Sequence, residues 1–485
     1  MDFNTDSNHH WHRLGILQEP HVGGCASIMA TVIENGLILS MRAGAEPEIG
    51  SILIGDDGRI VAVGAEVSPP PGAVIIDAER CIVMPGMIDA HRHSWLSSTR
   101  TSASGWTSYN FLKHIRGKAM QDYRPKDLYI SALVGMLDAL EGGVTTVLDY
   151  AHCLNSPEHV DANMEALEHS GARAVYGIGF NEVPGKRGGF RSLEERFDNL
   201  RNMVAKGSSN ELVTLWTSAS DLPFEGAQTL VEQVRASRAL GVPITLHGCV
   251  VQLPNLPTEV EALNAEGLLG PDILWAHMGL ATDEELKLVL DSGGKIVSLP
   301  AAEMLGAFIP PVIARWSALG GRPAIGVTMV TGAPRDLFTT MFAGMVSYRL
   351  DHPDTVPDDP GTFEVGMREA VEWATINGAE AVGLADRIGS LEPGKDADII
   401  ILRPGLVAEP VINPWGTVVS QLGTGNVDTV LVKGKVVKRD GKLLADTSRI
   451  ATDFRSTMDH LAHSNPVLRG PWVTGSGCGC NECSS

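Results

Sequence analysis

The central part of the chain alternates between short runs of apolar, β-branched residues and segments with helical periodicity. The runs are about 5–8 residues long, as expected of buried parallel strands. They are GMIDAHRH, VTTVLDYAH, ARAVYGIGF, LVTLWTSAS, VPITLHGCV, DILWAHMGL, KIVSLPAA and PAIGVTMV. Capped helices separate them, such as the one that Ser156 begins and Gly171 ends. Eight strand–helix units predict an α/β fold, a (β/α)8 TIM barrel over residues 85–388.

Both flanks of the predicted barrel contain short β-rich segments joined by Gly and Asp turns. Residues 28–84 and 389–445 therefore predict one small β-sandwich domain built from both chain ends. We expect residues 1–27 to be a flexible N-terminal segment. Residues 446–485 should form a C-terminal extension with a Cys-rich tail.

Composition narrows the class of partner. The chain has 485 residues, 44% of them hydrophobic, and a net charge of −20, which would repel nucleic acid and anionic lipid. No apolar run approaches the roughly 18 residues that a membrane span needs. The first residues lack the basic patch and apolar core of a secretory signal. We expect a cytoplasmic homo-oligomer that acts on a small molecule and binds neither nucleic acid nor membrane.

The seven cysteines are scattered and odd in number, which favours reduced thiols over a disulfide framework. Three lie in the last residues, at Cys478, Cys480 and Cys483. Three thiolates without a fourth ligand make a poor structural zinc site, so a reduced, disordered tail is expected. The His-rich start, "HHWH", is likewise assigned no function.

Four histidines fall at the carboxyl ends of predicted strands, where barrel enzymes carry their functional groups. His91 and His93 alternate at the end of the first strand and point the same way. His247 ends the fifth strand and His277 the sixth. Neutral imidazoles from separate strands can converge on one divalent ion, Zn²⁺ or else Fe²⁺ or Mn²⁺. The alternative is a set of hydrogen-bonded core histidines.

At these residues the chain resembles the amidohydrolase superfamily, in its cytosine-deaminase and chlorohydrolase-like branch. "VMPGMIDAHRH" resembles the family's first-strand signature, and "NGAEAVGLADRIGSLEPGKDADIIIL" resembles its closing helix and return to the β-sandwich. The resemblance covers nearly the whole chain. It implies that His91, His93 and His247 ligate the metal, and that His277 binds either the metal or the substrate oxygen.

The chain departs from the family pattern at two positions. Where the family has a metal-binding aspartate at the end of strand 8, this sequence has Thr328, or Met329 if the register slips by one. Where deaminating members have a proton-shuttling glutamate, it has Val250. A threonine hydroxyl is too weak a base at pH 7, so the usual proton acceptor is missing. A metal held only by imidazoles would favour an anionic oxygen of the substrate.

Other residues are candidates to replace the missing groups. Glu303, just after the seventh strand, is a better candidate for a catalytic base than Asp336, which is expected to cap a helix. Either Glu303 or His277 would move protons. His152, at the end of strand 2, is a candidate acid or orienting group, with a core histidine as the alternative. Trp95 and Trp106 lie in an aromatic segment after strand 1, which predicts substrate contacts or, as the alternative, a packed surface loop. Thr328 and Val250 are also expected to contact the substrate.

Three functions follow from this pattern. The first is metal-dependent hydrolysis of a non-peptide C–N bond in a small cyclic or heteroaromatic molecule. The second keeps the metal without hydrolysis, as in a lyase, isomerase, decarboxylase or cyclase of specialised metabolism, and the two departures favour it. The third is a non-catalytic binding protein.

Overall fold

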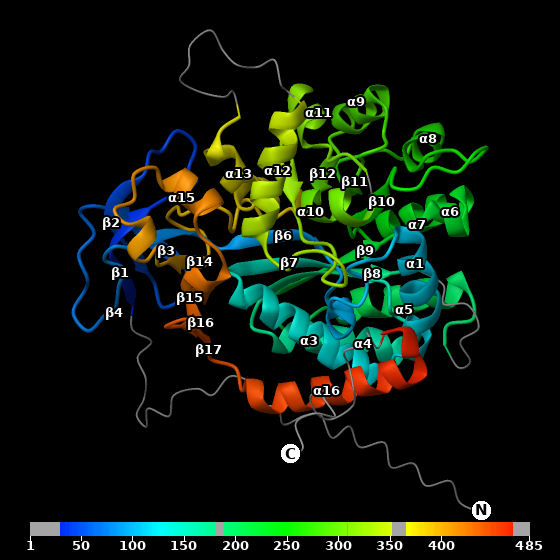
Figure 1. The fold of residues 1–485 in the computed structure, drawn as a ribbon, viewed down its shortest axis with the longest axis horizontal. Helices are drawn as coiled ribbons and strands as arrows, with labels where there is room; N and C mark the ends of the chain where they lie inside the picture. Colours follow the sequence, from blue (N-terminus) through cyan, green and yellow to red (C-terminus); the bar gives the residue numbers. More distant parts are fainter. Residues whose placement is uncertain (1–29, 181–188, 308, 352–364, 469–485) are drawn as a thin grey trace, which may run out of the picture.

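The computed structural model describes residues 30–180, 189–307, 309–351 and 365–468 (Figure 1). Eight parallel strands neighbour one another in chain order and form the barrel wall. They are β6 (Met87–Arg92), β7 (Val144–Ala151), β8 (Arg173–Gly179), β9 (Val213–Ser218), β10 (Ile244–Gly248), β11 (Ile273–His277), β12 (Lys295–Ser298) and β13 (Ala324–Ile325). Each lies within one of the eight predicted apolar runs, which confirms the predicted barrel.

The barrel closes between its first and last strands. The Thr328 N–H donates to the His91 carbonyl at 2.9 Å, and the His93 N–H donates to the Thr328 carbonyl at 2.7 Å. Gly326 makes this approach possible, because a Cβ atom there would lie 2.8 Å from the backbone nitrogen of His91. The seam thus places Thr328 directly beside the two histidines of the first strand.

Buried charges fasten the same seam. Asp89 accepts a hydrogen bond from the Val327 N–H at 2.9 Å. Its other carboxylate oxygen lies 3.1 Å from Arg92, and Arg92 also contacts Asp138 at 2.9 Å. The carboxylate of Asp89 is thereby committed to holding the first strand against the last.

Helices cover the outside of the barrel (Figure 1). The main ones are α3 (Pro125–Glu141), α4 (Pro157–His169), α5 (Leu193–Lys206), α7 (Ala227–Ala239), α8 (Glu259–Ala265), α9 (Asp283–Asp291), α11 (Ile313–Ala318), α12 (Leu337–Asp351), α13 (Met367–Trp373) and α14 (Ile376–Ala381). Further helical segments lie among them: η1 (Ser94–Thr99), α1 (Ser108–Phe111), η2 (Leu112–Ala119), α2 (Met120–Asp122), α6 (Leu222–Glu225), α10 (Pro300–Ala302) and η3 (Glu303–Ala307). Asp336 accepts from the Thr339 N–H at 2.9 Å, as the predicted cap of α12 requires.

A second sheet combines strands from both chain ends, shown in blue and orange in Figure 1. Its nine strands are β1 (Thr31–Ile38), β2 (Glu48–Ile54), β3 (Ile60–Gly64), β4 (Val74–Asp77), β5 (Ile82–Pro85), β14 (Ile399–Leu402), β15 (Val427–Val432), β16 (Lys435–Arg439) and β17 (Lys442–Leu443). The antiparallel pairing of β14 with β5 joins the two ends. Buried Arg173 of the barrel contacts Asp396 at 2.9 Å and Asp398 at 3.0 Å beside this sheet.

The chain then turns back along the barrel. Helix α16 (Thr447–Ser464) lies beside α3 (Figure 1), and η4 (Leu406–Ala408), α15 (Pro414–Ser420), η5 (Thr424–Asn426) and η6 (Pro466–Leu468) complete the described elements. The Thr457 hydroxyl donates to Asp127 at 2.8 Å, tying α16 to the start of α3. The segment predicted to be flexible at the start and the Cys-rich tail both lie outside the described residues.

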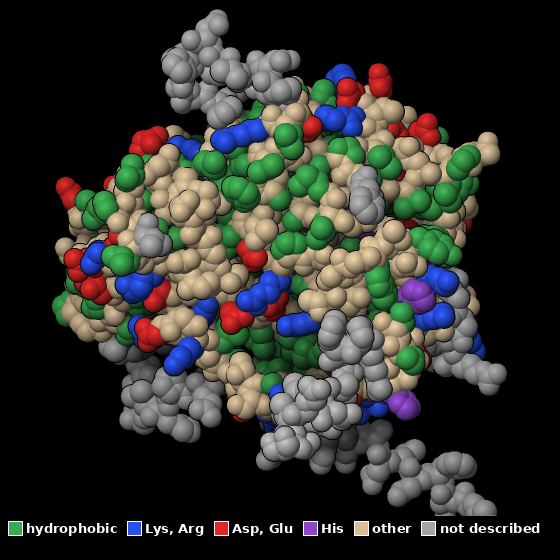
Figure 2. Space-filling model, viewed as in Figure 1, with side chains coloured by type: hydrophobic (Ala, Val, Ile, Leu, Met, Phe, Trp, Pro, Cys, Tyr) green, Lys and Arg blue, Asp and Glu red, His purple; other side chains and the backbone are tan. Residues whose placement is uncertain are grey.

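The surface is mixed in charge. Figure 2 shows acidic and basic side chains interspersed on the face viewed. Within the described ranges no helix is both long and apolar enough to cross a bilayer. Cys81, Cys153 and Cys249 are buried free thiols, as expected of reduced cysteines.

Candidate active site

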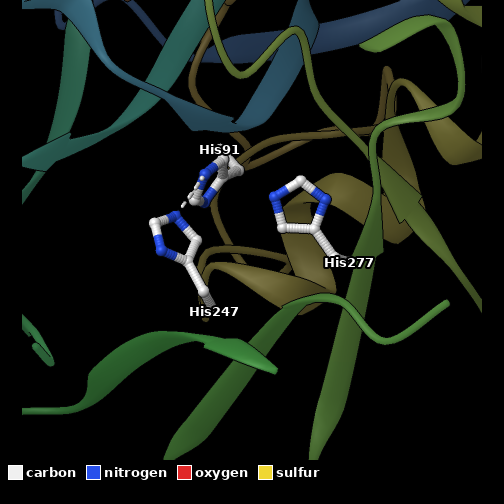
Figure 3. Close-up of side chains that lie close together, drawn as sticks. All are labelled: His91, His247 and His277. Carbon is white, nitrogen blue, oxygen red and sulfur yellow. Dashed lines mark hydrogen bonds between the residues drawn. The ribbon is translucent and has the colours of Figure 1, made fainter. Parts of the chain in front are cut away.

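Four histidines converge at the carboxyl end of the barrel strands. His91 lies in β6 and His93 just after it, while His247 and His277 come from β10 and β11. Figure 3 shows the rings of His91, His247 and His277 turned toward one another. One ligand nitrogen from each of these three lies within 4.8 Å of the others, and the same holds for His93, His152 and His247. The structure thus brings together all four histidines expected to bind metal.

Hydrogen bonds on the Nδ1 atoms orient three of these rings. The Nδ1 of His93 lies 2.9 Å from the Tyr150 carbonyl, that of His247 lies 2.7 Å from Asp221, and that of His277 lies 3.2 Å from Glu303. A carbonyl or carboxylate oxygen can only accept, so each Nδ1 carries the proton. Each Nε2 therefore keeps a lone pair for a metal or a proton.

The spacing of the rings fits a metal ion. The Nε2 atoms of His91 and His247 lie 3.3 Å apart, along the dashed line in Figure 3. Two nitrogen ligands at about 2.0–2.1 Å from a tetrahedral zinc ion are separated by about 3.4 Å. The Nδ1 of His91 is buried and has no hydrogen-bond partner among the described residues. These residues present the donor set that zinc prefers.

Burial keeps the rings of His91, His93 and His247 neutral. Burial, followed by the repulsion of neighbouring histidines, holds the pKa of His91 and of His93 well below the usual range. Burial also lowers the pKa of His247, although Asp221 opposes the shift. Burial disfavours ionisation of Asp221, but Arg116 and His247 outweigh it and hold the pKa of this carboxyl well below normal. Neutral imidazoles are the form that binds a metal.

A pocket of about 120 Å³ opens beside the histidines. This is room for several water molecules or part of a small ligand. Its wall combines apolar residues with titratable ones. The lining residues are His93, Ser108, Phe111, Leu112, Arg116, His152, Asp221, Pro223, Phe224, His247, Val250, Val251, Glu259, His277, Ala302, Thr328 and Met329.

Besides His91, which is fully buried within the histidine cluster, three expected site residues lie elsewhere than in this wall. Glu303 is fully buried behind His277, and its second oxygen accepts from Ser298 at 2.8 Å. Trp95 is fully buried because η1 turns inward after β6, and its indole N–H donates to the Nδ1 of His152 at 3.1 Å. Trp106 lines a neighbouring cavity. In place of the expected direct contacts with substrate, the structure puts Glu303 and Trp95 in contact with pocket histidines.

Thr328 and Val250 both line the pocket, as expected. Thr328 is 3% exposed and adopts a φ of 60°. A β-branched residue is rare in this left-handed conformation, whereas Asp and Asn adopt it more readily. His277 has a φ of 76°. Uncommon backbone conformations of this kind cluster at functional sites.

Sequence reasoning missed three groups at the site. Asp221 follows strand β9, so reading every strand end would have found it. It contacts both His247 and, at 2.9 Å, Arg116, which lies in the helix η2. Glu259, in the first turn of α8, accepts from the Cys249 N–H at 2.9 Å, and burial raises its pKa to about 7. Glu259 looks like an ordinary helix-start residue, and no local signal places it or Arg116 in the pocket.

A (β/α)8 barrel with neutral imidazoles gathered at the carboxyl ends of its strands, beside a pocket, has the architecture of a metal-dependent hydrolase. The family comparison gives the finer assignment. The amidohydrolase family model matches residues 82–437, and the chain belongs to this family.

Individual relatives agree with this assignment. The chain is 24% identical over 452 residues to the 5'-deoxyadenosine deaminase of Methanosarcina mazei, covering 89% of this chain and 98% of that one. An adenosine deaminase structure from Xanthomonas campestris with bound zinc has a TM-score of 0.81 at 20% identity, over 90% and 99% of the chains. Atrazine chlorohydrolase from Arthrobacter aurescens, complexed with zinc, has a TM-score of 0.78 at 21% identity, over 88% and 100%. Both structures share the fold described above.

Proposed function

We propose that this protein catalyses the metal-dependent hydrolysis of a non-peptide C–N bond in a small heteroaromatic molecule. The observation that carries the proposal is the convergence of four histidines beside a pocket in an amidohydrolase-family barrel. Relatives named as deaminases of adenosine compounds support a substrate of this kind.

The metal would be held by His91, His93 and His247, with His277 beside them. The 3.3 Å separation of His91 and His247 and the zinc in the related structures favour zinc. When bound, the ion would polarise the substrate and lower the pKa of a coordinated water. Thr328 supplies no negative charge to this site, so a substrate with an anionic oxygen would be favoured.

Proton transfer is assigned to the residues that can reach the reacting atoms. In hydrolytic deamination the hydroxyl of water joins the ring carbon, and the other proton of that water leaves with the amino group as ammonia. Glu259 lines the pocket, and with a pKa of about 7 its carboxyl can both accept and release a proton near neutral pH. Glu303 would act through His277, whose Nδ1 it contacts.

The test is release of ammonia from a panel of heteroaromatic amines that includes 5'-deoxyadenosine, 5'-methylthioadenosine and amines whose ring carries a carboxylate or a carbonyl. Glu259→Gln should lower kcat by on the order of 10²–10⁴-fold on any substrate found, because general acid–base catalysis contributes about that much. Glu261→Gln, on the same helix but exposed, is the matched control. A Glu259→Gln enzyme with wild-type kcat would remove Glu259 from the mechanism.

A second candidate is metal-assisted chemistry without water, such as a lyase, isomerase, decarboxylase or cyclase reaction. Thr328 and Val250 favour it, because both lack the acid–base group that hydrolysis uses in the family. Turnover in ¹⁸O-water separates the two. Label in the product supports hydrolysis, whereas unlabelled product under conditions without exchange supports the second candidate.

The sequence also suggests partners and a location for the enzyme. We propose that it acts on a small molecule, forms a homo-oligomer, binds no nucleic acid and lies in the cytoplasm. Sedimentation of the purified protein checks the oligomeric state, and fractionation of the source cells checks the location.

A further inference from the structure

His152 is held in one tautomer. It follows β7, is 2% exposed, and lines the pocket. Its Nδ1 accepts the indole N–H of Trp95 at 3.1 Å. An indole nitrogen can only donate, so Nδ1 carries the lone pair and the proton of the neutral ring is on Nε2. The Nε2 atom is buried and, among the described residues, meets no hydrogen-bond partner.

A second unsatisfied donor belongs to the same pocket. Arg116 uses one terminal nitrogen to contact Asp221 at 2.9 Å. Its Nε–H is buried, and the part of the chain that the structure describes offers it no acceptor. Asp221 also contacts His247, whose ring centroid lies 5.8 Å from that of His152, so both donors belong to the same part of the pocket wall. Leaving two buried donors unpaired is unfavourable, and a ligand can satisfy them.

Neither donor suits a metal. A guanidinium has no lone pair to offer, and the Nε2 of His152 carries a proton as long as Trp95 occupies Nδ1. Although His152 lies within ligand distance of His93 and His247, its hydrogen bond makes it a donor to an oxygen or nitrogen acceptor. The neighbouring wall is apolar, with Phe111, Leu112 and Met329, and suits a flat ring.

We propose that Arg116 and His152 together bind an oxygen acceptor of the substrate, a carboxylate or a ring carbonyl, and that Trp95 sets the tautomer needed for this contact. The inference rests on the proposed function, since it names the substrate class for the same pocket. The substrate would need an oxygen substituent, which the base of a simple aminopurine nucleoside lacks. Arg116 and His152 would be specificity residues, and Trp95 a positioning residue.

The test is binding of three small probes to the purified full chain by ligand-observed NMR titration. Benzoate carries a carboxylate, benzamide a neutral carbonyl, and indole neither. Wild-type protein should bind benzoate or benzamide more tightly than indole. His152→Phe and Arg116→Lys should each weaken that binding by on the order of tenfold, the usual loss for a charge-assisted or buried hydrogen bond. His152→Gln, which keeps an N–H donor, should retain more of it.

The probes and variants distinguish a carboxylate from a carbonyl oxygen, and loss of a direct contact from general damage to the fold. A loss for benzoate alone assigns a carboxylate, and a loss for both assigns a carbonyl oxygen. Arg100→Lys, a partly buried arginine outside the pocket wall, is the control and should bind the probes as wild type does. If His152→Phe does not fold, Trp95→Phe is used in its place. This variant removes the indole donor, so the ¹⁵N shifts of labelled histidine should show that His152 no longer has one fixed tautomer.

Other outcomes overturn the inference. The first is equal binding of indole and the oxygen probes. The second is an affinity within about twofold of wild type in folded His152→Phe and Arg116→Lys. The third is a crystal structure in which benzoate binds at the histidine cluster instead. The expected complex has an oxygen within about 3.2 Å of both Arg116 Nε and His152 Nε2. Because the readout is binding, it can fail while ammonia release succeeds, and the reverse also holds.

Discussion

His247 and Asp221 form a hydrogen bond of 2.7 Å at the mouth of the barrel, and Arg116 holds the other carboxylate oxygen of Asp221 at 2.9 Å. This contact determines which nitrogen of His247 faces the site. It also connects the histidine cluster to the helix that covers the pocket. The proposed metal ligand His247 and the proposed substrate contact Arg116 therefore share one carboxylate.

Replacing Asp221 with Asn should weaken metal binding by about 10–100-fold, the usual effect of losing the partner of a ligating histidine. Titration of metal-depleted protein with zinc, in competition with a chelator, measures the change. Asp272→Asn is the matched control, because Asp272 contacts Arg238 at 2.7 Å away from the histidine cluster. Equal zinc affinities of the two variants would contradict the orienting role.

His91→Ala should abolish stoichiometric metal binding, since His91 is one of the three proposed metal ligands. Elemental analysis of purified protein should find about one zinc, iron or manganese ion per wild-type chain and far less in the variant. Zinc at about 100 times its Kd should also add about 2.7 kcal/mol to the wild-type free energy of unfolding. His463→Ala, at an exposed position of α16, serves as the control and should keep the metal.

Thr328→Asp and Thr328→Asn separate backbone strain from metal binding. Both residues tolerate a φ of 60° better than threonine, so each should relieve strain on the order of 1 kcal/mol. Only the aspartate adds a negative charge, which is unfavourable in the buried metal-free site and favourable beside a cation.

We therefore expect thermal unfolding of Thr328→Asp to be shifted upward by zinc more than that of Thr328→Asn. In the absence of metal, Thr328→Asn should be the more stable of the two. An identical zinc response in both variants would show that position 328 lies too far from the ion.

Glu259→Gln should change the pH dependence of stability. Burial, reinforced by Asp221 and Glu285, raises the folded-state pKa of Glu259 from 4.5 to about 7. A raised carboxyl pKa favours the protonated form, so the stability it contributes is complete below about pH 4.5 and is lost as pH rises to about 7. Wild type should lose on the order of 3 kcal/mol relative to Glu259→Gln over this window.

Urea unfolding at several pH values between 4 and 8 measures this difference. Glu261→Gln should follow the wild-type curve, because Glu261 is exposed and Gln can keep its contact at the start of α8. Parallel curves for wild type and Glu259→Gln would place the pKa of Glu259 in its ordinary range.

The sequence by itself determined the barrel and the position of its chemistry. Alternating apolar runs and capped helices predict strands and their ends, because side-chain periodicity is a local property. Strand ends in turn identify His91, His93, His247 and His277, and they place Thr328 at the end of the eighth strand. These features need only the register within one strand.

Tertiary structure alone decided which groups meet around those histidines. Arg116 and Asp221 lie 105 residues apart, and Trp95 and His152 lie 57 apart, so only closure of the barrel brings each pair together. It also put Glu303 behind His277 and Glu259 into the pocket. A helix-start glutamate has the same local pattern whether it faces water or a ligand, and burial, which shifts its pKa, exists only in the folded chain.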